Sequence, residues 1–294
     1  MDLPRTRALL PDVMLREESP STNAELRELA IARAAAGDPL PHGSLLLTTN
    51  QTAGRGRLDR GWVTPPGTAV AASLLVSGFI GGRGFTGGQG RAAAPGSSPL
   101  GLSWLPLLAG SAITAALQPL FPDGLRVGVK WPNDVHVRDE EDAIAGRPGL
   151  KLCGILCEML PTGDVVVGTG INLLLPEWEL PTDRATSLLA GGADVGGAES
   201  LDDAAGQDLA DRVLAVYAAE LLRLVEWAAE DPDRARSRVL RHSLTLGSEV
   251  RVHLPGDEIV DGRARALADD GSLVVDLPTG GELVVSAGDV EHLR

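Results

Sequence analysis

Three arginines stand close together in the segment NQTAGRGRLDRGW. Arg55, Arg57 and Arg60 each carry a planar fork of N–H donors that matches the oxygens of a carboxylate or a phosphate. Gly54 and Gly56 between them leave the backbone able to close around a ligand. Each charge-assisted contact contributes about 1.5 to 3 kcal/mol, so the segment predicts an anion-binding loop. Taken alone, it is equally compatible with a solvated turn whose arginines pair with the chain's own carboxylates.

Lysine is almost absent from the chain. Of its 26 lysine and arginine residues, only Lys130 and Lys151 are lysines. Lysine offers a compact ammonium where arginine offers a wide fork, so a site that accepts only a point charge resists the exchange. The two lie in the motif-like stretches VKWPNDV and KLCGIL. We therefore expect a functional lysine at each position, the alternative being that two lysines remain by chance.

The overall charge limits the possible partners. The chain has 294 residues and a formal net charge of −14, which argues against broad binding to nucleic acid, so no DNA partner is expected. Any anion site must be local. The N-terminal stretch has no sustained apolar run, and no other stretch approaches the ~18 apolar residues of a membrane span. We expect a cytoplasmic protein with no membrane partner.

The two cysteines, Cys153 and Cys157, lie in an apolar run. No histidine or further cysteine stands near them to complete a zinc site. We therefore expect buried, reduced thiols without a metal or redox role.

The elements that position these residues follow from the pattern of the chain. STNAELRELAIARAAAGDP predicts a helix, with a capping box formed by Thr22 and Glu25 and a stop at Gly37. GSLLLTTNQ and TAVAASLLV predict buried strands on either side of the arginine segment. The arginine segment itself has neither a helical nor a strand period, so it is expected as a flexible loop joining two rigid strands.

The middle of the chain continues this mixture of strands and helices. Residues 100–120 predict a buried helix that Pro106 interrupts, and LRVGVKWPNDVHV predicts two strand pieces around a Pro-Asn-Asp turn. Residues 139–149 are expected as a solvated acidic loop. KLCGILCEML and DVVVGTGINLLL predict a hairpin, and DLADRVLAVYAAELLRLVEWAAE predicts an amphipathic helix. The fold class is therefore α/β (α+β), a mixed sheet flanked by helices.

A change of character near Ser243 predicts a domain boundary. Residues 1–242 are expected to form the catalytic domain, with residues 77–99 as a flexible Gly-rich insertion. Residues 243–294 predict four or five short strands with tight turns, which suits a small closed β-barrel.

Five segments resemble one enzyme family in order and spacing. GRGRLDRGW, KWPNDV, KLCGILCE, GTGINL and ESPSTN are similar to the motifs of biotin protein ligases, over a stretch from about Glu18 to Leu188. The resemblance implies a catalytic domain of the biotin/lipoate ligase type, related to class II aminoacyl-tRNA synthetases, followed by an SH3-like barrel. Bifunctional members carry a DNA-binding domain of about sixty residues, and only some twenty residues precede STN, so a monofunctional member is expected.

The resemblance also implies a reaction. Such an enzyme uses ATP and Mg²⁺ to convert biotin to biotinyl-5′-AMP with release of pyrophosphate. It then transfers biotin to one lysine of a biotin carboxyl carrier protein domain of acyl-CoA carboxylases. A monomer or a weak homodimer is expected.

The family motifs assign roles to particular residues of this chain. Lys151, Arg57 and Asp134 are the implied catalytic residues, and Asp134 is also the candidate ligand of magnesium or the group that orients the acceptor lysine. The implied biotin-binding residues are Ser21, Thr22, Asn23, Gln51, Gly54, Arg55, Gly56, Arg57, Lys151 and Gly154. The implied nucleotide-binding residues are Arg57, Arg60, Trp62, Lys130, Asn133, Lys151 and Asn172.

Two other functions stay open at this level. A ligase for lipoate or octanoate would share the adenylate chemistry, but hydroxyls and an amide at Ser21, Thr22 and Gln51 suit the ureido head of biotin and not a dithiolane. Ser21 and Thr22 also have a purely structural reading as helix caps. A noncatalytic sensor of biotin or its adenylate is the second alternative, and it predicts binding without pyrophosphate release.

Overall fold

The computed structural model describes residues 1–57, 60–79, 100–254, 258–286 and 288–293. Most of the segment expected as a Gly-rich insertion, residues 77–99, lies outside these ranges. Within the described residues, no helix is both long and apolar enough to cross a membrane.

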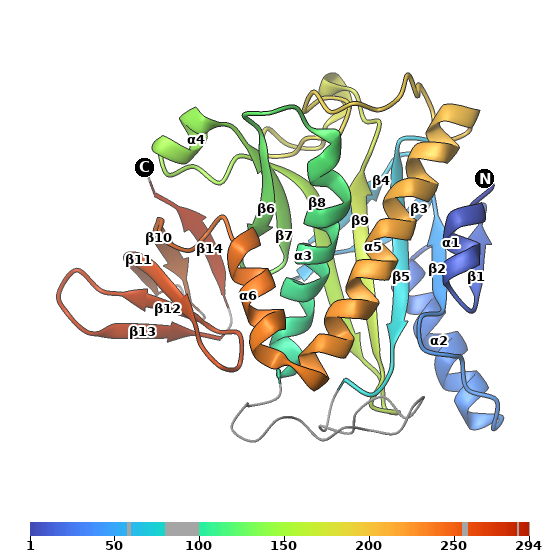
Figure 1. Cartoon of the computed structure of the whole chain (residues 1–294), viewed down its shortest axis with the longest axis horizontal. Helices are drawn as coiled ribbons and strands as arrows, with labels where there is room; N and C mark the ends of the chain where they lie inside the picture. Colours follow the sequence, from blue (N-terminus) through green and yellow to red (C-terminus); the bar gives the residue numbers. More distant parts are fainter. Residues whose placement is uncertain (58–59, 80–99, 255–257, 287, 294) are drawn as a thin grey trace.

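A seven-stranded mixed sheet forms the centre of the molecule (Figure 1). In spatial order its strands are β1 (Val13–Arg16), β2 (Leu45–Thr48), β5 (Ala69–Val76), β9 (Val165–Asn172), β8 (Leu150–Met159), β7 (Asp134–Arg138) and β6 (Arg126–Lys130). β1 and β2 run parallel, and every other pair of neighbours is antiparallel. All eight residues of β5 and of β9 are buried, as expected for apolar strands in the middle of a sheet. The predicted mixed sheet and the predicted β8–β9 hairpin are confirmed.

Helices cover the two faces of this sheet unequally. The α-helices are α1 (Pro4–Leu9), α2 (Thr22–Ala35), α3 (Leu105–Leu117), α4 (Glu140–Ile144), α5 (Ala204–Glu230) and α6 (Pro232–His242), and the short 3₁₀ turns are η2 (Leu102–Trp104), η3 (Gln118–Leu120) and η4 (Glu177–Glu179). α3, α5 and α6 pack together on one face (Figure 1).

Alternation along the strands separates two hydrophobic cores. Leu74 and Val167 join the large core with α3 and α5, whereas their neighbours Leu75 and Val166 join a small core with Leu26 of α2. Successive strand residues point to opposite faces, so α2 lies on the face opposite α3 and α5. α2 contacts β2, β5 and β9 and therefore covers only part of this face.

The start of α2 differs by one residue from the prediction. Ser21 is the N-cap, with extended backbone, and its Oγ accepts a hydrogen bond from the Ala24 N–H at 3.4 Å. Thr22 is instead the first residue of the helix, and its hydroxyl is engaged elsewhere. The helix ends at Ala35, and Gly37 adopts a positive φ of 78° as the predicted stop.

The arginine segment is more regular than a flexible loop. It contains β3 (Gln51–Arg55) and β4 (Gly61–Thr64), which form a separate antiparallel pair. Glycine at position 54 makes this pairing possible, because a Cβ there would collide with the Trp62 carbonyl and the Gln51 amide. Arg57 and Arg60 lie in the connection between the two strands.

The N-terminal stretch forms α1 and the edge strand β1. Two other predictions need correction. The acidic loop contains α4, which begins with Asp139 as its cap. α3 begins at Leu105, so Pro106 lies in its first turn, where a missing N–H is tolerated, and does not interrupt the helix.

The C-terminal strands form a five-stranded antiparallel sheet, which confirms a small all-β domain. Its order is β13 (Glu282–Val285), β12 (Leu273–Asp276), β11 (Ile259–Leu267), β10 (Glu249–His253) and β14 (Asp289–His292). Among the described residues, β13 and β14 are the edge strands. The sheet packs against the first domain through buried Trp131, which donates from its backbone to Thr245 Oγ1 and from Nε1 to the Gly271 carbonyl.

Candidate active site

A cavity lies on the same face of the large sheet as α2. Its floor is a row of small residues in direct register across three strands: Ala71 opposite Gly170, and Gly170 opposite Gly154. The next residue in the row is Asp134, opposite Gly154 on β7. Glycine and alanine leave a trough in a sheet that larger side chains would fill, so the sequence creates the cavity by omitting side chains.

The indole of Trp62 lies over this floor. A Cβ on Gly154 would approach Trp62 Cζ3 to 2.9 Å, and one on Gly170 would collide with the ring. Lys151 Nζ lies 5.5 Å from the ring centroid, within the range of a cation–π contact. Trp62 Nε1 is buried and has no partner among the described residues, which leaves one donor for a ligand in the cavity.

One end of the cavity is a buried network of hydroxyls and amides. The Thr22 N–H and Oγ1 both donate to Gln51 Oε1, at 2.9 and 3.2 Å. Ser73 Oγ lies 2.8 Å from Thr22 Oγ1 and 2.7 Å from Asn23 Oδ1. Asn23 Nδ2 in turn donates to Glu158 Oε2 at 2.7 Å. Ser73 is fully buried on β5 and was not among the residues expected from the sequence.

The other end of the cavity carries the cations. Among the described residues, Arg55, Arg57, Arg60 and Lys151 line it, with Asp134 as the one acidic lining residue. The described part of the lining thus has a formal excess of three positive charges, in a chain whose net charge is −14. This local reversal of sign is what an anion site requires.

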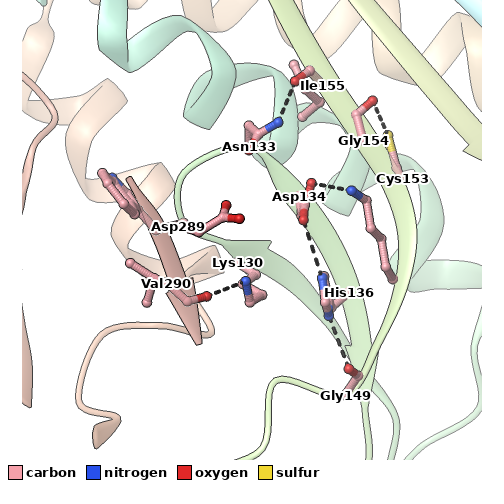
Figure 2. Close-up of polar contacts among 12 residues, drawn as sticks. Lys130, Asn133, Asp134, His136, Gly149, Cys153, Gly154, Ile155, Asp289 and Val290 are labelled. Atoms are coloured by element: carbon pink, nitrogen blue, oxygen red, sulfur yellow. Dashed lines mark hydrogen bonds and ion pairs between the residues drawn. The ribbon is translucent and has the colours of Figure 1, made fainter. Parts of the chain in front are cut away.

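Lys151 and Asp134 form an ion pair at the centre of this end. Lys151 Nζ lies 2.7 Å from Asp134 Oδ1. Asp134 Oδ2 faces His136 Nε2 at 3.9 Å, and His136 Nδ1 donates to the Gly149 carbonyl at 3.1 Å (Figure 2). Burial raises the pKa of Asp134, but His136 and Lys151 outweigh it and hold that pKa well below its usual range. Asp134 is therefore a carboxylate at neutral pH.

Asn133 links the Pro-Asn-Asp turn to β8 and to the arginine segment. Its Nδ2 donates to the Ile155 carbonyl at 2.7 Å, as Figure 2 shows, and its Oδ1 accepts from Arg57 Nη1 at 3.4 Å. Asn172 also lines the cavity, although its Nδ2 donates to the Thr186 carbonyl at 2.9 Å.

Two of the expected site residues lie away from the cavity. Lys130 Nζ donates to the Val290 carbonyl of β14 at 2.8 Å (Figure 2), so it joins the two domains. Gly54 serves the pairing of β3 with β4. The structure brings the others together around the cavity: Ser21, Thr22, Asn23, Gln51, Arg55, Gly56, Arg57, Arg60, Trp62, Asn133, Asp134, Lys151, Gly154 and Asn172. The binding role of each residue remains a prediction.

The cysteines take no part in the site. Burial raises the pKa of Cys153 and Cys157 well above that of an ordinary thiol, and neither forms a disulfide. No group of three histidine, cysteine or acidic side chains able to hold a metal is present in the described ranges. Cys153 is buried and Cys157 is partly buried, in line with their apolar run.

Comparison with solved structures gives the class of fold. The biotin protein ligase of Aquifex aeolicus, solved in complex with biotin and ATP, matches with a TM-score of 0.64 at 22% identity, covering 96% of this chain and 100% of that one. The fold is therefore that of the biotin protein ligases.

Comparison of sequences gives the family. A family model for the biotin protein ligase C-terminal domain matches residues 245–293. The biotin–[acetyl-CoA-carboxylase] ligase of Mycobacterium tuberculosis is 38% identical over 275 residues, which cover 93% of this chain and 86% of that protein. The bifunctional ligase/repressor BirA of Escherichia coli is 36% identical over 140 residues, or 46% of this chain and 35% of that protein. The chain belongs to the biotin–[acetyl-CoA-carboxylase] ligase family.

Proposed function

We propose that this protein is an ATP-dependent biotin protein ligase that acts in the cytoplasm, where ATP is available. It activates biotin to biotinyl-5′-AMP and transfers the biotinyl group to one lysine of a biotin carboxyl carrier domain of an acyl-CoA carboxylase. The observation that carries this proposal is a single cavity with a neutral hydrogen-bonding end and a cationic end, in a member of this family. Biotin has the matching ends, a ureido head and a carboxylate.

In the first step a biotin carboxylate oxygen attacks the α-phosphorus of ATP, and the bond from that phosphorus to the bridging oxygen breaks to release pyrophosphate. Thr22 and Gln51 bind the ureido head, which has both donors and an acceptor and must not be buried unpaired. Lys151 follows the negative charge as it moves from carboxylate to phosphate, which favours the transition state over the ground state. Arg55 and Arg57 hold the adenylate, and Arg60 contacts the leaving phosphates.

In the second step the carrier amine attacks the acyl carbon, the bond from that carbon to AMP breaks, and the amine loses a proton. Only about one lysine amine in a few thousand is neutral at pH 7, so help with this proton would speed transfer. The low pKa of Asp134 makes it a weak base, and its bond to Lys151 supports a positioning role. We propose that Asp134 orients Lys151 and the incoming amine.

Magnesium would enter with the nucleotide. Mg²⁺ prefers oxygen ligands, keeps several waters and is commonly bound by one or two carboxylates together with substrate phosphates. Asp134, the one acidic residue among the described lining residues, fits such a site as a single protein ligand. The ion would supply charge neutralisation on the phosphates, while the arginines orient them.

The deciding experiment combines the protein with biotin, MgATP and an isolated carrier domain. We expect pyrophosphate release and the mass of one biotinyl group on one carrier lysine. Lipoate and octanoate at the same concentration are the matched controls, and equal transfer of either acid would contradict the assignment to biotin. Binding of biotin without pyrophosphate would instead support a noncatalytic sensor.

Two further features belong to the same proposal. Residues 1–242 act as the catalytic domain and residues 243–294 as a separate C-terminal domain. The protein works as a monomer or a weak homodimer. Light scattering with and without biotin and ATP would measure the oligomeric state, and an obligate dimer would contradict it.

A further inference from the structure

The C-terminal sheet contacts the cavity through one strand. β14 is an edge strand, so backbone groups on its outer side can bind the first domain. Val290 accepts from Lys130 Nζ at 2.8 Å, and Asp289 Oδ1 lies 2.9 Å from Arg60 Nη2. The Gly288 carbonyl, just before the strand, accepts from Arg57 Nη2 at 3.5 Å. Two cations of the cavity are thus held by residues more than 200 positions away in sequence.

These contacts leave part of each arginine available. Arg60 donates Nε to the Arg57 carbonyl and Nη2 to Asp289. Arg57 donates Nη1 to Asn133 and Nη2 to Gly288. A guanidinium has five N–H donors, so among the described contacts each side chain keeps three for a ligand. Asp289 and Gly288 therefore fix the orientation of the two guanidinium groups without using them up.

The charge of Asp289 also acts on the cations around it. Burial lowers the pKa of Arg57 and of Lys130, and the Asp289 carboxylate opposes the shift in both. In Figure 2 the carboxylate of Asp289 points into the space between β14 and the Pro-Asn-Asp turn, beside Lys130. It is a shared counter-charge for three basic side chains.

We propose that Asp289 is a positioning residue for the nucleotide, acting through Arg60 and, with the Gly288 carbonyl, through Arg57. A flexible arginine loses rotamer freedom when it binds a phosphate, and a second domain that already holds it reduces this cost. The C-terminal sheet thereby affects ATP use and adenylate retention, while the biotin end of the cavity is unaffected. This inference rests on the proposed ligase function.

The opposite reading is that Asp289 occupies the place of a phosphate and must be displaced. The two readings predict opposite changes in the affinity for ATP. Removal of the carboxylate weakens ATP binding if Asp289 positions Arg60, and strengthens it if Asp289 competes with phosphate. The count of remaining donors favours positioning.

The test is the steady-state kinetics of Asp289→Asn, followed by pyrophosphate release. An exposed ion pair contributes about 0.2 to 1 kcal/mol, so we expect the KM for ATP and the release rate of bound biotinyl-5′-AMP to rise about 1.4- to fivefold. The kcat and the KM for biotin should change less than about twofold. Asp289→Glu, which keeps the charge, should restore most of the loss.

Two control variants test whether Asp289 acts through Arg60. Asp276→Asn breaks a comparable exposed pair between Asp276 of β12 and Arg265 of β11, away from the cavity, and should leave the KM for ATP unchanged. The double variant Asp289→Asn with Arg60→Gln should be no worse than Arg60→Gln alone, because Asp289 acts through Arg60. Thermal unfolding of each variant should match the parent protein.

An unchanged or lowered KM for ATP in Asp289→Asn, with the parent protein active, would overturn the inference. So would additive losses in the double variant. If the parent protein itself releases no pyrophosphate from biotin and ATP, the proposed function fails, and this outcome is distinct from the others.

Discussion

The two ends of the cavity are built differently. At the neutral end, Thr22 and Ser73 are almost fully buried and bond to one another. At the cationic end, the side chains of Arg60 and Lys151 are 59% and 30% exposed, and their partners lie on other elements. A rigid, preformed network suits a ligand group that does not change during reaction. Side chains held by a few hydrogen bonds and ion pairs suit a negative charge that moves during the reaction and a phosphate group that leaves.

The largest effect should come from Lys151→Arg. The wider guanidinium cannot replace a point charge that follows the carboxylate oxygen onto phosphorus, so adenylate formation should slow by about 10²- to 10³-fold. Pyrophosphate release at saturating substrates measures it. Arg212→Lys, at an exposed pair with Asp208 on α5, is the control exchange and should be silent. A decrease of less than tenfold in the rate of pyrophosphate release by the Lys151 variant would contradict the role assigned to Lys151.

Arg57→Gly should speed the release of bound biotinyl-5′-AMP more than it slows the formation of this intermediate. Loss of one charge-assisted contact costs about 1.5 to 3 kcal/mol, so bound adenylate should escape about ten- to a hundredfold faster and label lysines of a bystander protein. A streptavidin blot of carrier mixed with serum albumin reports this. Arg57→Lys should give an intermediate result. Label on the carrier alone would contradict retention by Arg57.

Ser73→Ala should weaken ligand binding at the neutral end of the cavity only. Removing this hydroxyl leaves Thr22 and Asn23 each short of a partner, which should weaken biotin binding about tenfold with the KM for ATP unchanged. Calorimetry with biotin measures the first quantity. Ser44→Ala removes another buried hydroxyl, one that bonds to Pro41 outside the cavity, and should leave both quantities unchanged. Equal losses for biotin and ATP would mean that the two ends are not independent.

A fall in pH should weaken ligand binding at both ends of the cavity together, because it lowers the free energy of unfolding of the whole protein. Burial, reinforced by the charge of Arg238, lowers the pKa of His242 to about 4. The unfolded chain therefore binds more protons, and the free energy of unfolding falls as the pH drops from about 6.5 to 4, by about 2 kcal/mol for this partly exposed group. His242→Gln should remove this contribution from the pH dependence of the free energy of unfolding, measured by urea titrations. Loss of biotin binding before unfolding would contradict a common cause.

Much of the scaffold could be predicted from local patterns. Continuous apolar runs predicted β5, β8 and β9, and the helical spacing of apolar residues over 208–230 predicted most of α5. The arginine segment was harder, since its sequence has neither a helical nor a strand period. Its strands form because Gly54 admits the carbonyl of Trp62, a close approach that no periodicity reveals.

The site also contains one residue and two contacts that the sequence did not predict. Ser73 stands in the apolar run TAVAASLLV and reads as part of the core, although a lone hydroxyl on the face of Ala71 could have signalled a polar pocket. The bond of Lys130 to Val290 spans 160 positions, and that of Arg60 to Asp289 spans 229. Contacts of this range depend on how domains pack, which local spacing does not encode.

The scarcity of lysine has a consequence for a protein that would make an amine-reactive product. The Lys130 ammonium is buried against a carbonyl and that of Lys151 is bound to Asp134, so neither is a ready nucleophile. Apart from five histidines, the remaining basic side chains are arginines, which do not form stable amides with an activated acid. An enzyme of this composition can hold its own reactive intermediate with little self-modification.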